Sequence, residues 1–137
     1  MSLEYQNIIL KDKPKTFENF IELYSYHNMQ TFFISGLPLE EIKSNPQIAF
    51  EKTKKIIQEH YTGFIFTEYF NESLLLLNKE LKFKKLFYKK ENVSKNKIEL
   101  PLNYKELIMK YNEADILLYK YLLNLFQEKR KEKKYPR

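Results

Sequence analysis

The stretch GFIFTEYFNESLLLLNKEL, residues 63–81, decides the predicted fold. Its first part, Phe64–Thr67, is β-prone and apolar without alternation, which is typical of a short strand covered on both faces. Gly63 is expected to end the preceding helix, and Asn71 to cap the following one. Residues 46–82 therefore predict a helix, a short buried strand and a second helix. This order indicates a helix-rich α/β fold with one or two short strands and about five helices.

The sequence before this stretch predicts two helices with a loop between them. Thr16 is placed to cap a short helix, and Asn45 followed by Pro46 is a favourable helix start. Between them, NMQTFFISGL (28–37) breaks the helical periodicity and is followed by Pro38. We therefore expect a loop at residues 28–37.

The sequence after this stretch adds a candidate second strand at Leu86–Tyr88 and two further helices. Each of these helices is expected to begin at a capping box: Asn103-x-x-Glu106 and the weaker Asn112-x-x-Asp115. The last helix is predicted from about residue 113 to 133, and residues 127–137 predict a frayed basic tail. The length suits one compact core, so 1–137 is expected to be a single domain.

The composition excludes several kinds of site. The chain has 137 residues, 43% hydrophobic and 31% charged, which is typical of a globular domain. It contains no cysteine, which excludes disulfides, thiolate zinc sites and cysteine nucleophiles. Its two glycines, Gly36 and Gly63, are too far apart to form a Walker loop or a dinucleotide fingerprint.

The two histidines are too few for a three-histidine metal site, and we expect no metal. His60 falls on the apolar stripe of its predicted helix and is expected to be a core or boundary residue. His27 follows a helix beside Asn28, where capping or exposure is expected rather than catalysis.

The net charge of +6 is concentrated in the second half of the chain. Residues 1–68 hold 7 Lys and Arg against 9 Asp and Glu, whereas residues 69–137 hold 17 against 9. The segment Lys79–Lys97 alone contains eight lysines. Such an excess attracts anionic partners, although composition alone favours a solvated lysine-rich face.

No targeting or membrane segment is predicted. The first ten residues lack a basic region followed by a long apolar stretch, and the longest purely apolar run, Leu74–Leu77, is too short to cross a bilayer. The expected location is therefore the cytoplasm.

Four segments, in order, resemble one family. They are NMQTFFISG (28–36), FIFTEYFNESLLLLNKEL (64–81), YKKENVSKNK (88–97) and LIMKYNEADILLYKYLLNLF (107–126). Together they resemble the C-terminal half of the membrane-type carbohydrate sulfotransferases, which include hexuronyl and galactosyl sulfotransferases and bacterial relatives. The resemblance covers about residues 28–126, and its most specific part is the run EYFNESLLLL.

The resemblance implies part of a P-loop-like sulfotransferase fold and transfer of sulfate from 3′-phosphoadenosine 5′-phosphosulfate (PAPS) to a carbohydrate hydroxyl. Two family motifs are absent: the phosphosulfate loop P-K-x-x-x-x-S/T and the 3′-phosphate segment R-x-P-x-x-R-x-x-S. Phe32 also stands where the family has an arginine. The chain is therefore expected to be inactive alone, with a partner N-terminal half missing, and no catalytic base is assigned.

The resemblance also implies that the lysine-rich loop lies over the nucleotide. Its candidate cofactor-binding residues are Lys90 and Lys95 for phosphate charge, and Asn92 and Ser94 for hydrogen bonds. For Glu68, a helix-entry or buried hydrogen-bonding role is expected ahead of one in orienting the acceptor. The alternative function is a non-catalytic basic module that binds nucleic acid or sulfated polysaccharide, because aromatic residues stand among the lysines.

Overall fold

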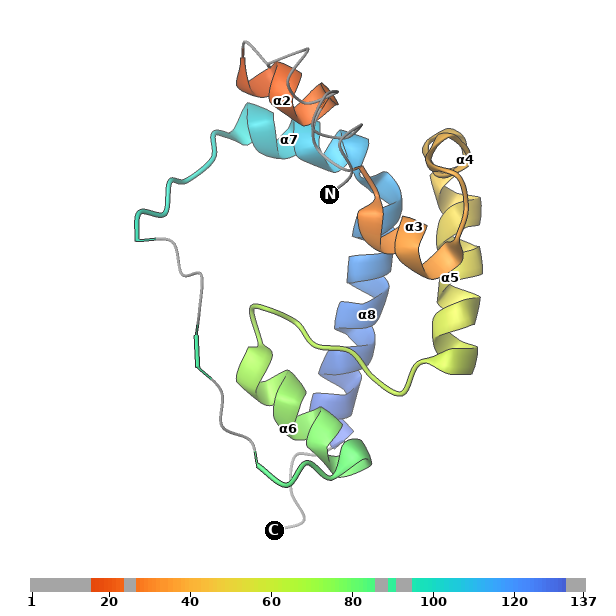
Figure 1. The fold of residues 1–137 in the computed structure, drawn as a ribbon, viewed down its shortest axis with the longest axis vertical. Coiled ribbons are helices and arrows are strands. Elements are labelled where there is room, and N and C mark those ends of the chain that lie inside the picture. Colours follow the sequence, from red (N-terminus) through yellow and green to blue (C-terminus); the bar gives the residue numbers. More distant parts are fainter. Residues whose placement is uncertain (1–15, 24–26, 86–88, 91–94, 133–137) are drawn as a thin grey trace, which may run out of the picture.

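The computed structural model describes residues 16–23, 27–85, 89–90 and 95–132 (Figure 1). Within these residues the chain forms seven helices and no strand. The helices are α2 (Phe17–Leu23), α3 (Met29–Ser35), α4 (Leu39–Ser44), α5 (Pro46–His60), α6 (Phe70–Leu81), α7 (Leu102–Tyr111) and α8 (Glu113–Glu132). The predicted α/β fold, and with it a P-loop-like sulfotransferase fold, is therefore wrong for the described part of the chain.

The predicted strand Phe64–Thr67 lies in an irregular segment that joins α5 to α6 (Figure 1). A strand requires a neighbouring strand that takes up its backbone hydrogen bonds. No backbone hydrogen bond joins residues 62–65 to another described residue. The apolar run is instead buried by packing, because Phe66, at 6% exposure, lies against α8. The second candidate strand, Leu86–Tyr88, lies outside the described residues.

The segment predicted as a loop, residues 28–37, contains the short helix α3. It begins after Asn28 and ends at Gly36, both with left-handed backbone (φ 54° and 67°). Thr31 and Ser35 are buried in this helix, while Phe32 and Ile34 pack against two separate core clusters. The buried positions of this helix are therefore polar, whereas the helical pattern sought in a sequence has apolar residues there. For this reason the helix was not predicted.

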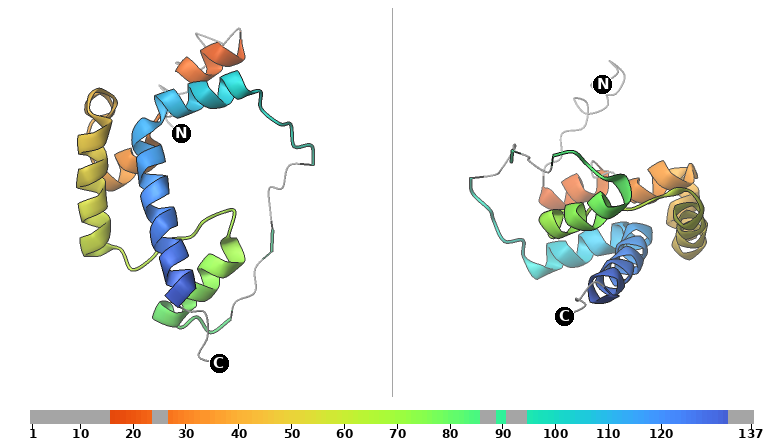
Figure 2. Two further views of the ribbon diagram at one scale, coloured as in Figure 1. Left: turned by 180° about the vertical axis from the view of Figure 1, so that it is seen from behind. Right: turned by 90° about the horizontal axis from the view of Figure 1, so that it is seen from below.

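The core lies where α5 and α8 run side by side, with α3 and α4 packed against them (Figure 2). One cluster joins Ile42, Ala49 and Ala114, and a second joins Phe50, Ile57 and Leu118. The predicted start of α5 at Asn45–Pro46 is confirmed, with Pro46 in its first turn. His60 is not a core residue, because its side chain is 69% exposed and lies 3.7 Å from Glu59.

The remaining helices extend the molecule at its two ends. The edge of the Phe17 ring of α2 contacts Tyr104 of α7, with ring centroids 4.8 Å apart, and Thr16 caps α2 through the Asn19 amide as predicted. At the other end, α6 lies beside the C-terminal half of α8 (Figure 1), where Glu72 and Arg130 pair at 3.2 Å. Helix α8 continues through Glu132, so residues 127–132 of the predicted frayed tail are helical, and their side chains are all exposed.

The two predicted capping boxes do not form as expected. Helix α7 begins at Leu102 with Pro101 at the N-cap position and no side-chain cap, so Asn103 lies inside the helix and not at its start. Asn112 and Asp115 direct their side-chain oxygens to the α3 region rather than to their own helix. No described helix is long and apolar enough to cross a membrane.

Candidate functional site

Helices α3 and α8 cap each other at their N-terminal ends. The carboxylate of Asp115 accepts hydrogen bonds from the Gln30 amide (3.1 Å), the Thr31 amide (2.8 Å) and the Thr31 hydroxyl (2.6 Å). In return, the Asn28 side-chain oxygen accepts the Asp115 amide at 3.1 Å. The first amides of a helix lack partners within it, so each side chain satisfies donors of the other helix.

The same contact extends to α7. The Asn28 amide donates to the Asn112 side-chain oxygen at 2.9 Å, and the Asn28 side-chain nitrogen donates to the Tyr111 carbonyl at 3.3 Å. His27 stacks on Tyr111, and its Nε2 lies 2.7 Å from the Ile21 carbonyl oxygen, so this nitrogen carries the proton. His27 thus caps the end of α2 and is half-buried rather than exposed.

A second set of contacts holds the segment between α5 and α6. The buried Ser73 hydroxyl accepts the Phe66 amide at 3.1 Å. The Phe66 ring lies 5.3 Å from Phe126 and 5.5 Å from Tyr119, centroid to centroid, on α8. Ser73, within the run that most specifically resembles the family, therefore has a structural role.

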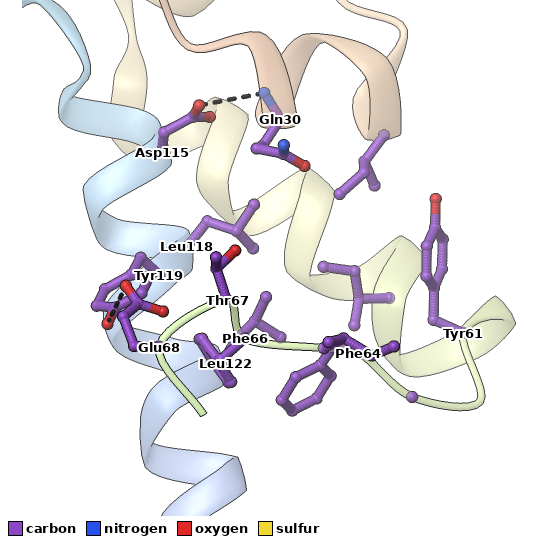
Figure 3. Close-up of a pocket in the computed structure, with 14 residues that line it drawn as sticks. Gln30, Tyr61, Phe64, Phe66, Thr67, Glu68, Asp115, Leu118, Tyr119 and Leu122 are labelled. Carbon is purple, nitrogen blue, oxygen red and sulfur yellow. Dashed lines mark hydrogen bonds between the residues drawn. The ribbon is translucent and has the colours of Figure 1, made fainter. Parts of the chain in front are cut away.

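These contacts enclose an open cavity of about 480 Å³ between α3, α5, α8 and the 61–68 segment (Figure 3). Its lining residues are Gln30, Ile34, Ile57, Tyr61, Gly63, Phe64, Ile65, Phe66, Thr67, Glu68, Asp115, Leu118, Tyr119 and Leu122. Figure 3 shows Glu68 and Tyr119 on one side, and Tyr61 and Phe64 on the opposite side. An apolar wall with a few convergent polar groups is the usual form of a small-molecule site.

The polar side of the cavity centres on Glu68 and Tyr119. The Tyr119 hydroxyl donates to Glu68 Oε1 at 3.3 Å. Partial burial, and then the Glu68 carboxylate, raise the pKa of Tyr119 above its usual value of 10.0. Both effects disfavour the tyrosinate anion, so Tyr119 stays a hydrogen-bond donor at neutral pH.

Of the cofactor-binding residues predicted from the sequence, Lys90 and Lys95 do not line this cavity. Lys90 and Lys95 are exposed on the connector between α6 and α7, whereas Asn92 and Ser94 lie outside the described residues. Glu68 was expected at a helix entry, and it does precede α6, although it also borders the cavity. Sequence reasoning missed Gln30, Thr67 and Tyr119. Tyr119 could have been found from its spacing, because it lies one helical turn after Asp115 and so on the same face of the helix.

No group of three histidine, aspartate or glutamate side chains able to hold a metal ion is found among the residues that the structure describes. In comparisons with known proteins, no family model, curated protein or solved structure matches the chain. The function is therefore argued from the residues and their geometry.

Proposed function

We propose that this chain is the acceptor-side part of a PAPS-dependent carbohydrate sulfotransferase. One observation carries the proposal: polar groups from the segments that resemble the family form hydrogen bonds to one another across the fold. The Asn28 backbone amide donates to the Asn112 side-chain oxygen, and the Thr31 hydroxyl donates to Asp115 Oδ1. Two segments that lie far apart in the sequence are thus joined in the fold, as expected if both were kept from the same parent domain.

The cavity beside this unit suits a sugar better than a nucleotide. Its aromatic rings offer faces for the apolar side of a sugar ring, and its carboxylates, amide and hydroxyls offer partners for sugar hydroxyls. Its described lining residues include no lysine, arginine or histidine to neutralise phosphate groups. The sugar acceptor is accordingly assigned to this cavity.

The nucleotide is assigned to the connector between α6 and α7. Lys90 and Lys95 are exposed and form no ion pair with any described residue, so their ammonium groups suit phosphate oxygens. Asn92 and Ser94 complete the proposed contact by hydrogen bonds. In the reaction, the bond between sulfur and the bridging phosphate oxygen breaks, the sugar oxygen bonds to sulfur, and a base outside the assigned residues takes the hydroxyl proton.

The test is calorimetric titration of the whole chain with 3′-phosphoadenosine 5′-phosphate and, separately, with AMP. Because the chain lacks the phosphosulfate loop, we expect weak binding, in the range of about 1 mM, and a clear preference for the bisphosphate. A radiolabelled sulfate-transfer assay of the chain alone should show no turnover. Equal affinity for the two nucleotides, or robust transfer by the chain alone, would contradict the proposal.

A second candidate function is binding of a polyanion such as nucleic acid or a sulfated polysaccharide. It is favoured by the connector, whose described residues 82–85, 89–90 and 95–99 are all exposed and include seven lysines. Polyanion binding weakens steeply as salt rises, because each neutralised phosphate releases counterions. A steep salt dependence with long oligonucleotides, without preference for the bisphosphate, would favour this candidate over the first.

A further inference from the structure

Among the residues that the structure describes, the charge of the cavity lining has one sign. Glu68 and Asp115 are acidic, and none of the described lining residues is basic. The Asp115 carboxylate is already satisfied by the start of α3. The Glu68 carboxylate is exposed and makes one bond, from the Tyr119 hydroxyl to Oε1. Its Oε2 atom has no partner among the described residues and is free to accept a hydrogen bond from a ligand.

Aromatic rings border the same space. Tyr119 is 40% exposed beside Glu68, and Tyr61 is 51% exposed on the opposite side (Figure 3). The π-face of an aromatic ring attracts cations, most strongly beside a carboxylate that is already negative. An anion would meet the Glu68 charge with no compensating cation among the described lining residues, and its binding is disfavoured.

One cation contacts an aromatic ring that the cavity shares with a second cavity. The Lys129 ammonium nitrogen lies 6.0 Å from the Phe64 ring centroid. It borders a separate, smaller cavity of about 170 Å³ together with Glu80 and Glu132. Lys129 is therefore not a lining residue of the 480 Å³ cavity, and two carboxylates share its surroundings.

We infer that the 480 Å³ cavity selects a sugar unit with a free, protonated amino group and rejects units with a carboxylate or sulfate. The amine lies at Glu68 Oε2, and the sugar ring lies between Tyr119 and Tyr61. This inference rests on the proposed function for its assignment of the ligand as an acceptor sugar. The charge selectivity itself follows from the lining residues.

The experiment uses three trisaccharides, of glucosamine, N-acetylglucosamine and galacturonic acid, which are cationic, neutral and anionic at mildly acidic pH. Each is titrated into the ¹⁵N-labelled chain at low salt, and shifts of the Gln30, Thr67 and Tyr119 amides are followed. We expect the glucosamine trimer to bind most tightly and the galacturonate trimer most weakly. Glu68→Gln should weaken the glucosamine trimer about two- to five-fold, as for an exposed charge pair.

The control is Glu128→Gln, which removes the same charge from an exposed position of α8 that does not line the cavity. It should leave the order of the three sugars unchanged. The inference is overturned if galacturonate binds as tightly as glucosamine, if Glu68→Gln has no larger effect than Glu128→Gln, or if no sugar shifts the cavity amides. The nucleotide titration uses no acceptor oligosaccharide, so the proposed function and this inference can fail separately.

Discussion

Oδ1 of Asp115 accepts both the amide and the hydroxyl of Thr31, at 2.8 and 2.6 Å, across 84 positions of sequence. Thr31 is fully buried, so these donors have no access to water if the carboxylate is removed. A carboxylate near the start of α8 thereby fixes the start of α3. The central contact of the fold is polar, and it joins two of the segments on which the family resemblance depends.

Replacement of Asp115 should destabilise the fold strongly. Asp115→Ala leaves the Thr31 amide and hydroxyl unpaired, and we expect the free energy of unfolding to fall by about 3 kcal/mol. Urea denaturation followed by circular dichroism measures this change. Glu113→Ala, at an exposed position in the same first turn, should cost less than about 1 kcal/mol. Similar losses for the two variants would show that the capping contact has little energetic weight.

Ser73→Ala tests the bond that holds the irregular segment. The substitution leaves the buried Phe66 amide without its acceptor, and we expect a loss of about 1–3 kcal/mol. Ser44→Ala is the matched control, because the Ser44 hydroxyl donates to the Glu40 carbonyl at an exposed position. That variant should change the unfolding midpoint very little. A Ser73→Ala protein as stable as the control would contradict the assigned role.

The end of α6 predicts opposite effects of one substitution at two lysines. Lys82 has left-handed backbone (φ 51°), which favours glycine, so Lys82→Gly should raise stability by about 1 kcal/mol. Lys79 lies within the helix, and Lys79→Gly should lower stability by about the same amount. Thermal unfolding of both variants measures the difference. A loss of stability at both positions would mean that α6 does not end at Lys82.

The Glu68–Tyr119 pair predicts a pH effect. Glu68→Gln removes the negative charge that helps to raise the pKa of Tyr119, so that pKa should fall toward 10.0 without reaching it, because burial remains. NMR titration of ring-labelled tyrosine follows the change. In the parent chain, the contribution of Tyr119 to stability is present below pH 10 and is lost as pH rises through the raised value. An unchanged Tyr119 pKa in Glu68→Gln would exclude the electrostatic coupling.

Local signals in the sequence predicted several helix limits well. Thr16 and Pro46 lie where capping and proline preferences place them, and both depend on neighbouring residues only. Helix α8 also starts at Glu113 as predicted, although Asn112 and Asp115 bond to the α3 region instead of forming the expected capping box.

The failures of prediction have a common cause in tertiary contacts. Phe64–Thr67 has the composition of a strand, but pairing depends on a neighbour that the local sequence does not reveal. Residues 28–37 look irregular because Thr31 and Ser35 are buried, and Asp115 supplies the cap from another helix. The candidate cavity was missed for the same reason, since its polar groups come from three separate segments.

The most direct test of the central claim compares nucleotide affinities in two double variants of the connector. Lys90→Gln with Lys95→Gln removes the proposed phosphate contacts, and Lys84→Gln with Lys85→Gln removes the same charge from exposed neighbouring positions. Calorimetry should show that the first variant loses the preference for 3′-phosphoadenosine 5′-phosphate over AMP, whereas the second keeps it. Equal effects of the two variants, or no preference in the parent chain, would contradict the assignment of a sulfotransferase nucleotide site.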